Sequence, residues 1–181
     1  SAPTDGTCSH AWNRTGFNND CNCGQYKTVF AETIGRTTSS SISNHKFNNS
    51  SLFFSGTADI SNTDQSTGYQ FSSGNSNVVI SNTQGNYFEI SGINTTSLVS
   101  PLIEFGVYKS TTYSNGSDLV IEVSCNGINY TPIQYTILPT GTGSDKWYFV
   151  KSTGFLSNCS NLRIRFKQNG SSTTFKLDDI Y

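Results

Sequence analysis

Short hydrophobic runs recur along the chain from Tyr26 onward, and clusters of Gly, Ser, Asn and Thr separate them. No segment combines a helical hydrophobic period with start and stop signals, so the pattern predicts strands. We therefore expect an all-β fold, an antiparallel β-sandwich, over residues 26–181. The expected strands cover residues 29–34, 52–54, 78–80, 87–90, 102–108, 119–123, 133–138, 147–151, 162–166 and 175–181.

The alternation of residue types is clearest in residues 162–167, which read Leu-Arg-Ile-Arg-Phe-Lys. Successive side chains of a strand point to opposite faces, so the three hydrophobic side chains face a core and the three cations face water. The Asn-Gly dipeptides at residues 126–127 and 169–170 favour tight hairpins because both residue types tolerate positive φ. At least one outer sheet face is therefore predicted to be polar and wet.

Composition supports this fold class and limits the partners. Ser, Thr, Asn and Gly fill 85 of the 181 positions, whereas charged residues make up 13% and the net charge is -1. A chain with so little positive charge lacks the field that holds nucleic acid or an anionic bilayer surface. No run approaches the ~18 apolar residues of a membrane helix. We expect no nucleic-acid partner and no membrane insertion.

Residues 1–25 form a distinct segment that holds Cys8, Cys21 and Cys23 and shows no alternating pattern. We expect an irregular arm, pinned by a disulfide from Cys8 to Cys21 or Cys23. Zinc binding by these cysteines with His10 is the alternative, but the Cys-x-Cys spacing is one residue short of the usual pair. The domain division is therefore an arm over 1–25 and a sandwich over 26–181.

Two further cysteines lie next to expected strands of the sandwich. Cys125 follows one strand and Cys159 precedes another, so we predict a disulfide that joins the two loops. Disulfides in a small polar chain are typical of an oxidising compartment. We therefore expect a secreted protein that is extracellular or attached to a cell surface.

Catalytic motifs are scarce. His10 and His45 lack metal-ligand spacing, and no nucleophile elbow, phosphate loop or zincin motif is present. A glycosidase-like carboxylate pair could be drawn from four acids, but these lie in or beside expected strands as ordinary outward residues. The four acids are Glu89, Glu104, Asp118 and Glu122. We expect a non-catalytic protein, with a small secreted hydrolase as the least favoured alternative.

Acidic residues gather where the sandwich is expected to begin and end. Glu32 lies in the first strand, Asp59 follows a turn, and Asp178 and Asp179 are adjacent in the last strand. One of two adjacent aspartates in an apolar strand must face the interior unless a cation or a donor meets it. Oxygen ligands of this kind suit Ca²⁺, and an exposed strand end with two solvated acids is the alternative.

A series of segments carries a family likeness. They are Phe30-Ala-Glu-Thr-Ile-Gly, Phe54-Ser-Gly-Thr-Ala-Asp-Ile-Ser-Asn-Thr, Ser66-Thr-Gly-Tyr, Ser73-Gly-Asn-Ser-Asn-Val, Phe88-Glu-Ile-Ser-Gly-Ile-Asn-Thr, Tyr108-Lys-Ser, Asn115-Gly-Ser-Asp-Leu-Val-Ile-Glu-Val-Ser, Asn161-Leu-Arg-Ile-Arg-Phe and Leu177-Asp-Asp-Ile. Together, over about residues 27–181, they resemble the jelly-roll domains of secreted Bacteroidetes proteins, which often follow a catalytic domain. The chain is also similar to galactose-binding-type and MAM-like sandwiches. That resemblance implies a structural calcium site with Glu32 and Asp178 as first ligands, then Asp59 and Asp179.

The resemblance implies carbohydrate binding or adhesion but no particular sugar. Sugar rings stack on Trp and Tyr, and their hydroxyls bond to polar side chains. The candidate carbohydrate-binding residues are Trp147, Tyr113 and Tyr69, although core packing is equally expected for Trp147. We expect a secreted module that binds a polysaccharide or glycan. The alternative is an accessory domain that packs on a catalytic partner.

Overall fold

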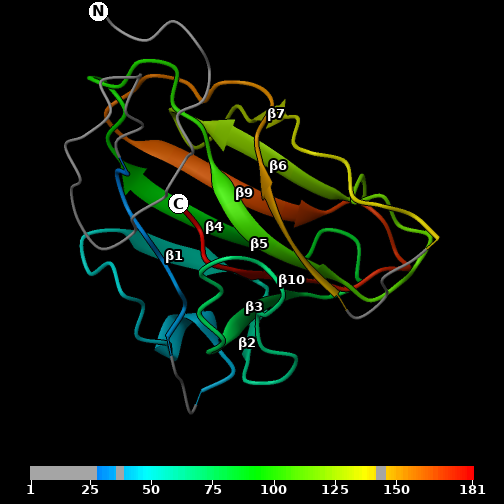
Figure 1. The fold of residues 1–181 in the computed structure, drawn as a ribbon. Helices are drawn as coiled ribbons and strands as arrows, with labels where there is room; N and C mark the ends of the chain where they lie inside the picture. The colour runs from blue at the N-terminus through cyan, green and yellow to red at the C-terminus, as the bar shows by residue number, and fades with distance from the viewer. Residues whose placement is uncertain (1–27, 36–38, 142–145) are drawn as a thin grey trace, which may run out of the picture.

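The computed structural model describes residues 28–35, 39–141 and 146–181, and these form a β-sandwich of two five-stranded antiparallel sheets (Figure 1). The expected arm over 1–25 lies outside the described residues. The first sheet has the order β1 (Phe53–Gly56), β4 (Tyr87–Ile93), β9 (Leu162–Gln168), β6 (Leu119–Ser124) and β7 (Thr131–Ile133). The second has the order β2 (Asp59–Ser61), β3 (Asn77–Ile80), β10 (Phe175–Asp178), β5 (Glu104–Lys109) and β8 (Lys146–Lys151).

The strand order is that of a jelly roll. Only β2–β3 and β6–β7 follow one another within a sheet, and every other consecutive pair of described strands changes sheets. The expected all-β sandwich is therefore confirmed. Within the described residues, the helical structure is a single 3-10 turn, η1 (Ile42–Asn44).

Two sequence expectations need correction. The strand expected at 29–34 is reduced to one bridge between Glu32 and Ile180, and Ile34 has a positive φ of 60° that ends any extended run. The hairpin at Asn126-Gly127 exists, since β6 pairs with β7, but the second strand starts only at Thr131. No hairpin forms at residues 169–170, because β9 and β10 belong to different sheets. Turn dipeptides thus predict where the chain turns but not which sheet it enters.

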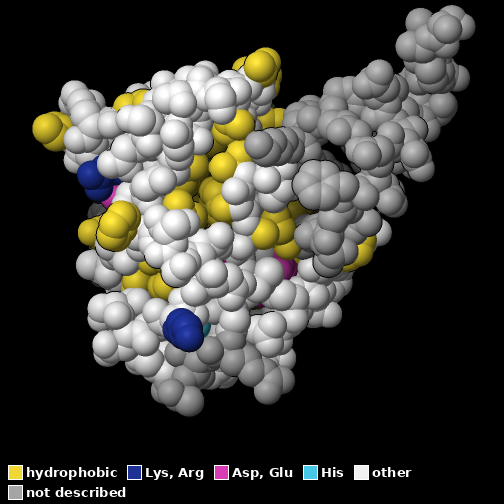
Figure 2. Space-filling view, turned by 90° about the vertical axis from the view of Figure 1, so that its left-hand side faces the viewer, with side chains coloured by type: hydrophobic (Ala, Val, Ile, Leu, Met, Phe, Trp, Pro, Cys, Tyr) yellow, Lys and Arg dark blue, Asp and Glu magenta, His cyan; other side chains and the backbone are white. Residues whose placement is uncertain are grey.

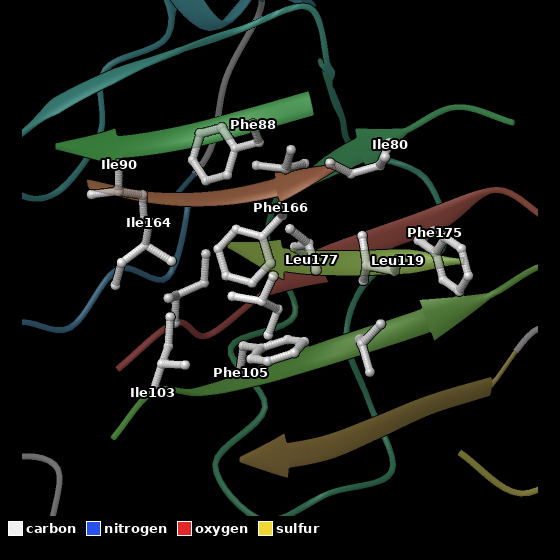
Figure 3. Packing of buried hydrophobic residues seen from close by; sticks show 14 of the residues in the cluster. Ile80, Phe88, Ile90, Ile103, Phe105, Leu119, Ile164, Phe166, Phe175 and Leu177 are labelled. Carbon is white, nitrogen blue, oxygen red and sulfur yellow. The ribbon is translucent and has the colours of Figure 1, made fainter. Parts of the chain in front are cut away.

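Aromatic and branched side chains from both sheets form the core between them (Figure 3). Phe88 and Phe166 of the first sheet and Phe105 and Phe175 of the second are fully buried. The rings of Phe105 and Phe166 meet edge to face across the sandwich, with centroids 5.2 Å apart. The inward residues of β9 are buried and its outward residues are half-buried, as the alternation predicts.

The predicted disulfide between Cys125 and Cys159 is confirmed, with a Cα–Cα distance of 5.9 Å. It joins the end of β6 to the loop that leads into β9, its neighbour in the first sheet. Among the described residues, no helix is long and apolar enough to span a membrane.

Candidate functional site

The outer face of the first sheet carries a connected set of charged and aromatic side chains. Strand alternation places Arg163, Arg165 and Lys167 of β9 on this face. Glu89 of β4 lies directly opposite Arg165 on one side, and Glu122 of β6 lies opposite it on the other. Three neighbouring strands thus bring acids and bases into one row.

Ion pairs link this row. Arg165 Nε lies 2.9 Å from Glu89 Oε2, and Arg165 Nη1 lies 3.4 Å from Glu122 Oε1. Lys167 Nζ approaches Glu122 Oε1 to 3.1 Å, whereas Arg163 Nη1 is 3.5 Å from Glu89 Oε1. Arg165 is therefore the centre of the network, and Arg163 and Lys167 lie at its two ends.

Two tyrosines frame the central arginine. The Arg165 guanidinium carbon lies 3.7 Å from the ring centroid of Tyr130 and 4.9 Å from that of Tyr87. The Tyr130 hydroxyl donates a 2.8 Å hydrogen bond to Glu89 Oε2. Burial, followed by this bond to a carboxylate, raises the pKa of the Tyr130 hydroxyl, so it stays a proton donor. We call Tyr87, Glu89, Glu122, Tyr130, Arg163, Arg165 and Lys167 the Arg–Tyr face.

The charges of the Arg–Tyr face differ in exposure. The side chains of Glu89 and Glu122 are only 6% and 11% exposed. Those of Arg163, Arg165 and Lys167 are 34%, 24% and 33% exposed. The cations therefore meet the solvent beside the half-buried Tyr87 and Tyr130, and the carboxylates lie beneath them.

The outer face of the second sheet is covered by residues 62–76, and this explains the position of Trp147. Its side chain points away from the core, yet it is only 7% exposed. Its indole nitrogen donates a 3.0 Å hydrogen bond to the carbonyl of Asp64 in the covering segment. Trp147 is therefore a packing residue beneath the covering segment, which is the alternative to sugar binding that the sequence left open.

Tyr69 fastens the same covering segment. Its ring stacks on Phe149 with centroids 5.4 Å apart, and its hydroxyl donates to Asp179 Oδ2. It lies directly over Gly106 of β5, where any Cβ would collide with the Tyr69 hydroxyl. A glycine in the strand is therefore what lets the tyrosine approach the sheet.

Tyr113, the third expected sugar-binding residue, is 65% exposed on the loop after β5. That loop is anchored by Lys109, whose fully buried ammonium donates to the carbonyls of Thr112, Ser114 and Pro139. The structure does not bring Tyr113, Tyr69 and Trp147 together, since Tyr69 and Trp147 are committed to the covered sheet face.

Asp178 and Asp179 are both fully buried where β10 ends. Asp178 Oδ2 accepts hydrogen bonds from Ser66 at 2.6 Å and Ser73 at 3.0 Å. Asp179 Oδ2 accepts from Tyr69 and from the Ser73 amide, and its Oδ1 has no partner among the described residues. Burial first, and then the neighbouring Asp179 charge, raises the pKa of Asp178 to about 7.

The other two expected calcium ligands lie elsewhere. The Glu32 main chain pairs with Ile180, but its side chain accepts four N–H bonds, from Ile34, from Asn48 and twice from Asn49. Asp59 is exposed on β2. Within the described ranges, no three His, Cys, Asp or Glu side chains form a metal-binding cluster. Of the four expected ligands, the side chains of Asp178 and Asp179 come together.

The end of the sandwich holds a cavity of about 560 Å³, lined mainly by hydrophobic residues. Figure 2 views this end and shows hydrophobic side chains along a hollow strip. Val99 on its rim is 93% exposed, and Thr28 to Phe30 form part of its wall. Its lining also includes Glu104 and Lys151, so the cavity is a second candidate site, separate from the Arg–Tyr face.

Comparisons with known proteins show the fold. No family model matches the chain, and no curated protein matches it in sequence. The K2 cleaved adhesin domain of Lys-gingipain is similar with a TM-score of 0.54 and 12% identity, over 83% of this chain and 95% of that one. CBM29_1, a family 29 carbohydrate-binding module from Piromyces equi, has a TM-score of 0.49 and 11% identity, over 84% and 89%.

A glycoside hydrolase family 43 arabinoxylan arabinofuranohydrolase from Bacillus subtilis matches 71% of this chain, with a TM-score of 0.48 and 12% identity. The chain spans only 26% of that enzyme. At 12% identity the likeness to the adhesin domain shows the fold alone, and the ligand has to be argued from the chain's own residues.

The Arg–Tyr face was not predicted as a site from the sequence. The cations of β9 were expected on a wet face, and Glu89 and Glu122 were expected to be ordinary outward residues. The signal that could have found the site is the pairing of β4, β9 and β6, which puts their outward charges in one row. Tyr130 carried no such signal, because only the folded loop brings it over Arg165.

Proposed function

We propose that this protein is a non-catalytic carbohydrate-binding or adhesion module, and that the Arg–Tyr face is its binding surface. The observation that supports this is the combination of Tyr87 and Tyr130 with hydrogen-bonding charged groups that are already held in place by one another. Tyrosine rings offer apolar surface for the C–H faces of sugars, and the fixed charges offer donors and acceptors for hydroxyls. Such preorganisation lowers the entropy cost of binding.

The shape of the site favours a chain over a small molecule. The outward row on β9 from Arg163 to Lys167 spans about 13 Å along a half-exposed strand. A small ligand needs a concave pocket, whereas an extended polysaccharide can lie along a strand and gain contacts from several residues. Glu89 and Glu122 are each ion-paired with Arg165, so their role in this surface is to hold the arginine in place.

A glycan array with the purified domain, followed by affinity electrophoresis in polysaccharide gels, tests the proposal. We expect retardation in at least one polysaccharide, and its loss in Tyr87→Ala with the melting temperature little changed. Binding to no glycan at millimolar ligand would contradict the proposal and favour the accessory-domain alternative. Hydrolysis of a polysaccharide that a single carboxylate substitution abolishes would instead indicate an enzyme.

We also propose a structural Ca²⁺ ion at the end of β10, held by the side chains of Asp178 and Asp179. The unpartnered Asp179 Oδ1 and the buried, adjacent carboxylates support this, since a cation would offset their repulsion. The hydroxyls of Ser66 and Ser73 supply further oxygens nearby. The ion would fix the covering segment 62–76 against β10 and supply no chemistry.

Thermal melts in EDTA, in excess Ca²⁺ and in excess Mg²⁺ test this ion. Stabilisation by mass action is about 2.7 kcal/mol at a hundredfold excess over the dissociation constant. We expect the rise in melting temperature with Ca²⁺ to disappear in Asp178→Asn, while the exposed Asp59→Asn serves as the control and keeps it. Equal melting temperatures in all three solutions would contradict the ion and mean that hydrogen bonds alone stabilise Asp178 and Asp179.

Secretion completes the proposal. The Cys125–Cys159 bond supports an oxidising, extracellular location, because cytosolic reductants keep most such thiols reduced. Export to the periplasm or medium in the native host, followed by mass mapping of unreduced peptides, checks this. A cytosolic, fully alkylated Cys159 would contradict it.

A further inference from the structure

We propose that the Arg–Tyr face selects an anionic polysaccharide, one whose sugars carry uronate carboxylates. This inference rests on the proposed function and specifies its ligand class. The face holds three cations, Arg163, Arg165 and Lys167, against two carboxylates, and so carries one net positive charge on a protein whose net charge is -1. Its local sign is thus opposite to that of the whole chain.

Exposure strengthens the charge argument. Glu89 and Glu122 lie under the cations, with side chains 6% and 11% exposed, so an approaching ligand meets positive groups first. Arg165 is largely committed, because it bonds to both carboxylates and lies against Tyr130. The charge that a ligand can use therefore comes from the two ends of the row.

Arg163 and Lys167 have unused donors at those ends. Arg163 makes one long ion pair of 3.5 Å through Nη1 within the described part of the chain, and because its Nε–H is buried, a ligand would meet its terminal N–H groups. A guanidinium has five N–H donors in a planar fork that matches a carboxylate, and an ammonium has three. Among the described residues, Lys167 forms one ion pair, to Glu122 at 3.1 Å. Both side chains are about one-third exposed and can reach a ligand.

The two tyrosines favour a sugar polymer over other anionic ligands. Tyr87 lies opposite Lys167 across the β4–β9 pair, so an aromatic ring and a cation adjoin one another. A uronic acid presents an apolar ring face beside a carboxylate, and the two groups can contact a ring and a cation together. Single-stranded nucleic acid would need a broader cationic groove than a row of three.

Affinity electrophoresis and calorimetry with polygalacturonate, alginate and hyaluronan, each paired with its carboxyl-reduced neutral form, test the inference. EDTA is present throughout, so that calcium bridges between chains do not contribute. We expect at least one acidic polymer to bind about tenfold or more tightly than its reduced form, with affinity falling as salt rises.

Variants then assign the effect to the face. Arg163→Gln with Lys167→Gln removes two cations but leaves both glutamates paired with Arg165, so the fold should persist, and the melting temperature checks this. We expect this double variant to lose about tenfold in affinity for the acidic polymer and to keep its affinity for any neutral one. Lys146→Gln removes an exposed cation from β8 of the other sheet and should bind as the parent does. Lys167→Arg should retain binding.

The outcomes separate the two proposals. Equal binding of acidic and reduced polymers, or unchanged acidic binding in the folded double variant, would overturn the inference while the carbohydrate-binding proposal stands. Binding to no polymer would overturn both. Tighter binding of single-stranded oligonucleotides than of any uronate polymer, lost in the double variant, would replace the polysaccharide with nucleic acid.

Discussion

The two outer sheet faces carry similar charged and aromatic residues, but these residues are partly exposed on one face and covered on the other. On the first sheet, Arg165 forms ion pairs with Glu89 and Glu122, and the side chain of Arg165 remains partly exposed to solvent. On the second sheet, Lys176 is only 8% exposed and bonds to Thr63 and Asp64 of the segment that covers it. The difference is the covering segment 62–76. A charged or aromatic residue on an outward strand position is therefore a binding candidate only where no loop of the same chain occupies it.

The covered face is held by bonds from side chains to a loop. Trp147 donates to the Asp64 carbonyl, Asp178 accepts from Ser66, and Tyr69 donates to Asp179. Each of these contacts buries a polar group with a partner, which avoids the cost of an unpaired one. The covered face therefore contributes to stability, and the Arg–Tyr face remains available for ligand.

Trp147→Ala is expected to have the largest effect, because it removes a buried aromatic side chain and its hydrogen bond. The free energy of unfolding should fall by about 3–5 kcal/mol. Urea unfolding measures this, and polysaccharide affinity per folded molecule should not change. Trp147→Phe keeps most of the packing and should cost less. A loss of affinity at full stability would mean that the covered face contributes to binding.

Loss of the disulfide should affect both stability and the open face. The bond joins two cysteines that are 34 residues apart in the sequence. For a loop of this length the chain-entropy model gives a stabilisation of about 3–4 kcal/mol. Cys125 also begins the loop that leads to Tyr130, so Cys125→Ser with Cys159→Ser should weaken polysaccharide binding as well. Denaturant unfolding and affinity electrophoresis measure the two effects. Unchanged binding in the folded variant would show that Tyr130 is positioned by its own contacts.

The covered face should make stability depend on pH through the buried carboxyl group of Asp178. Asp178, which faces Asp179 and Ser66, has its pKa raised to about 7, so the folded state holds more protons than the unfolded state between about pH 4 and pH 7. Stability in EDTA should therefore be full near pH 4 and fall as pH rises to 7, by about 2–4 kcal/mol.

Melts across this pH range measure the effect, and Asp178→Asn should remove most of the slope. Excess Ca²⁺ should remove it also if the ion binds, because the cation replaces the proton between the two carboxylates. A melting temperature in EDTA that rises from pH 4 to 7 would contradict the assigned burial of Asp178.

The sequence predicted the sandwich because the signals for strands are local. The alternation in residues 162–167 defined β9 and its wet side, and the cysteine positions defined the disulfide. The binding candidates were less well predicted, because residues 62–76 cover Trp147, and Tyr69 lies in that covering segment and packs onto the sheet. Which strands neighbour one another, and which loop covers a face, are decided by long-range packing that one sequence does not display.

The smallest effect on stability is expected for Tyr113→Ala, and it decides where the ligand lies. Tyr113 is 65% exposed, so its removal should change the free energy of unfolding by less than about 0.5 kcal/mol. If the Arg–Tyr face binds the polysaccharide, Tyr113→Ala should keep its affinity, whereas Tyr87→Ala should reduce it by about tenfold through the loss of a stacking ring. Calorimetry with one polysaccharide compares the two variants directly. The reverse result would move the site to the loop that Lys109 anchors, because a ring fixed on a rigid loop can stack on a sugar as well as one on a strand.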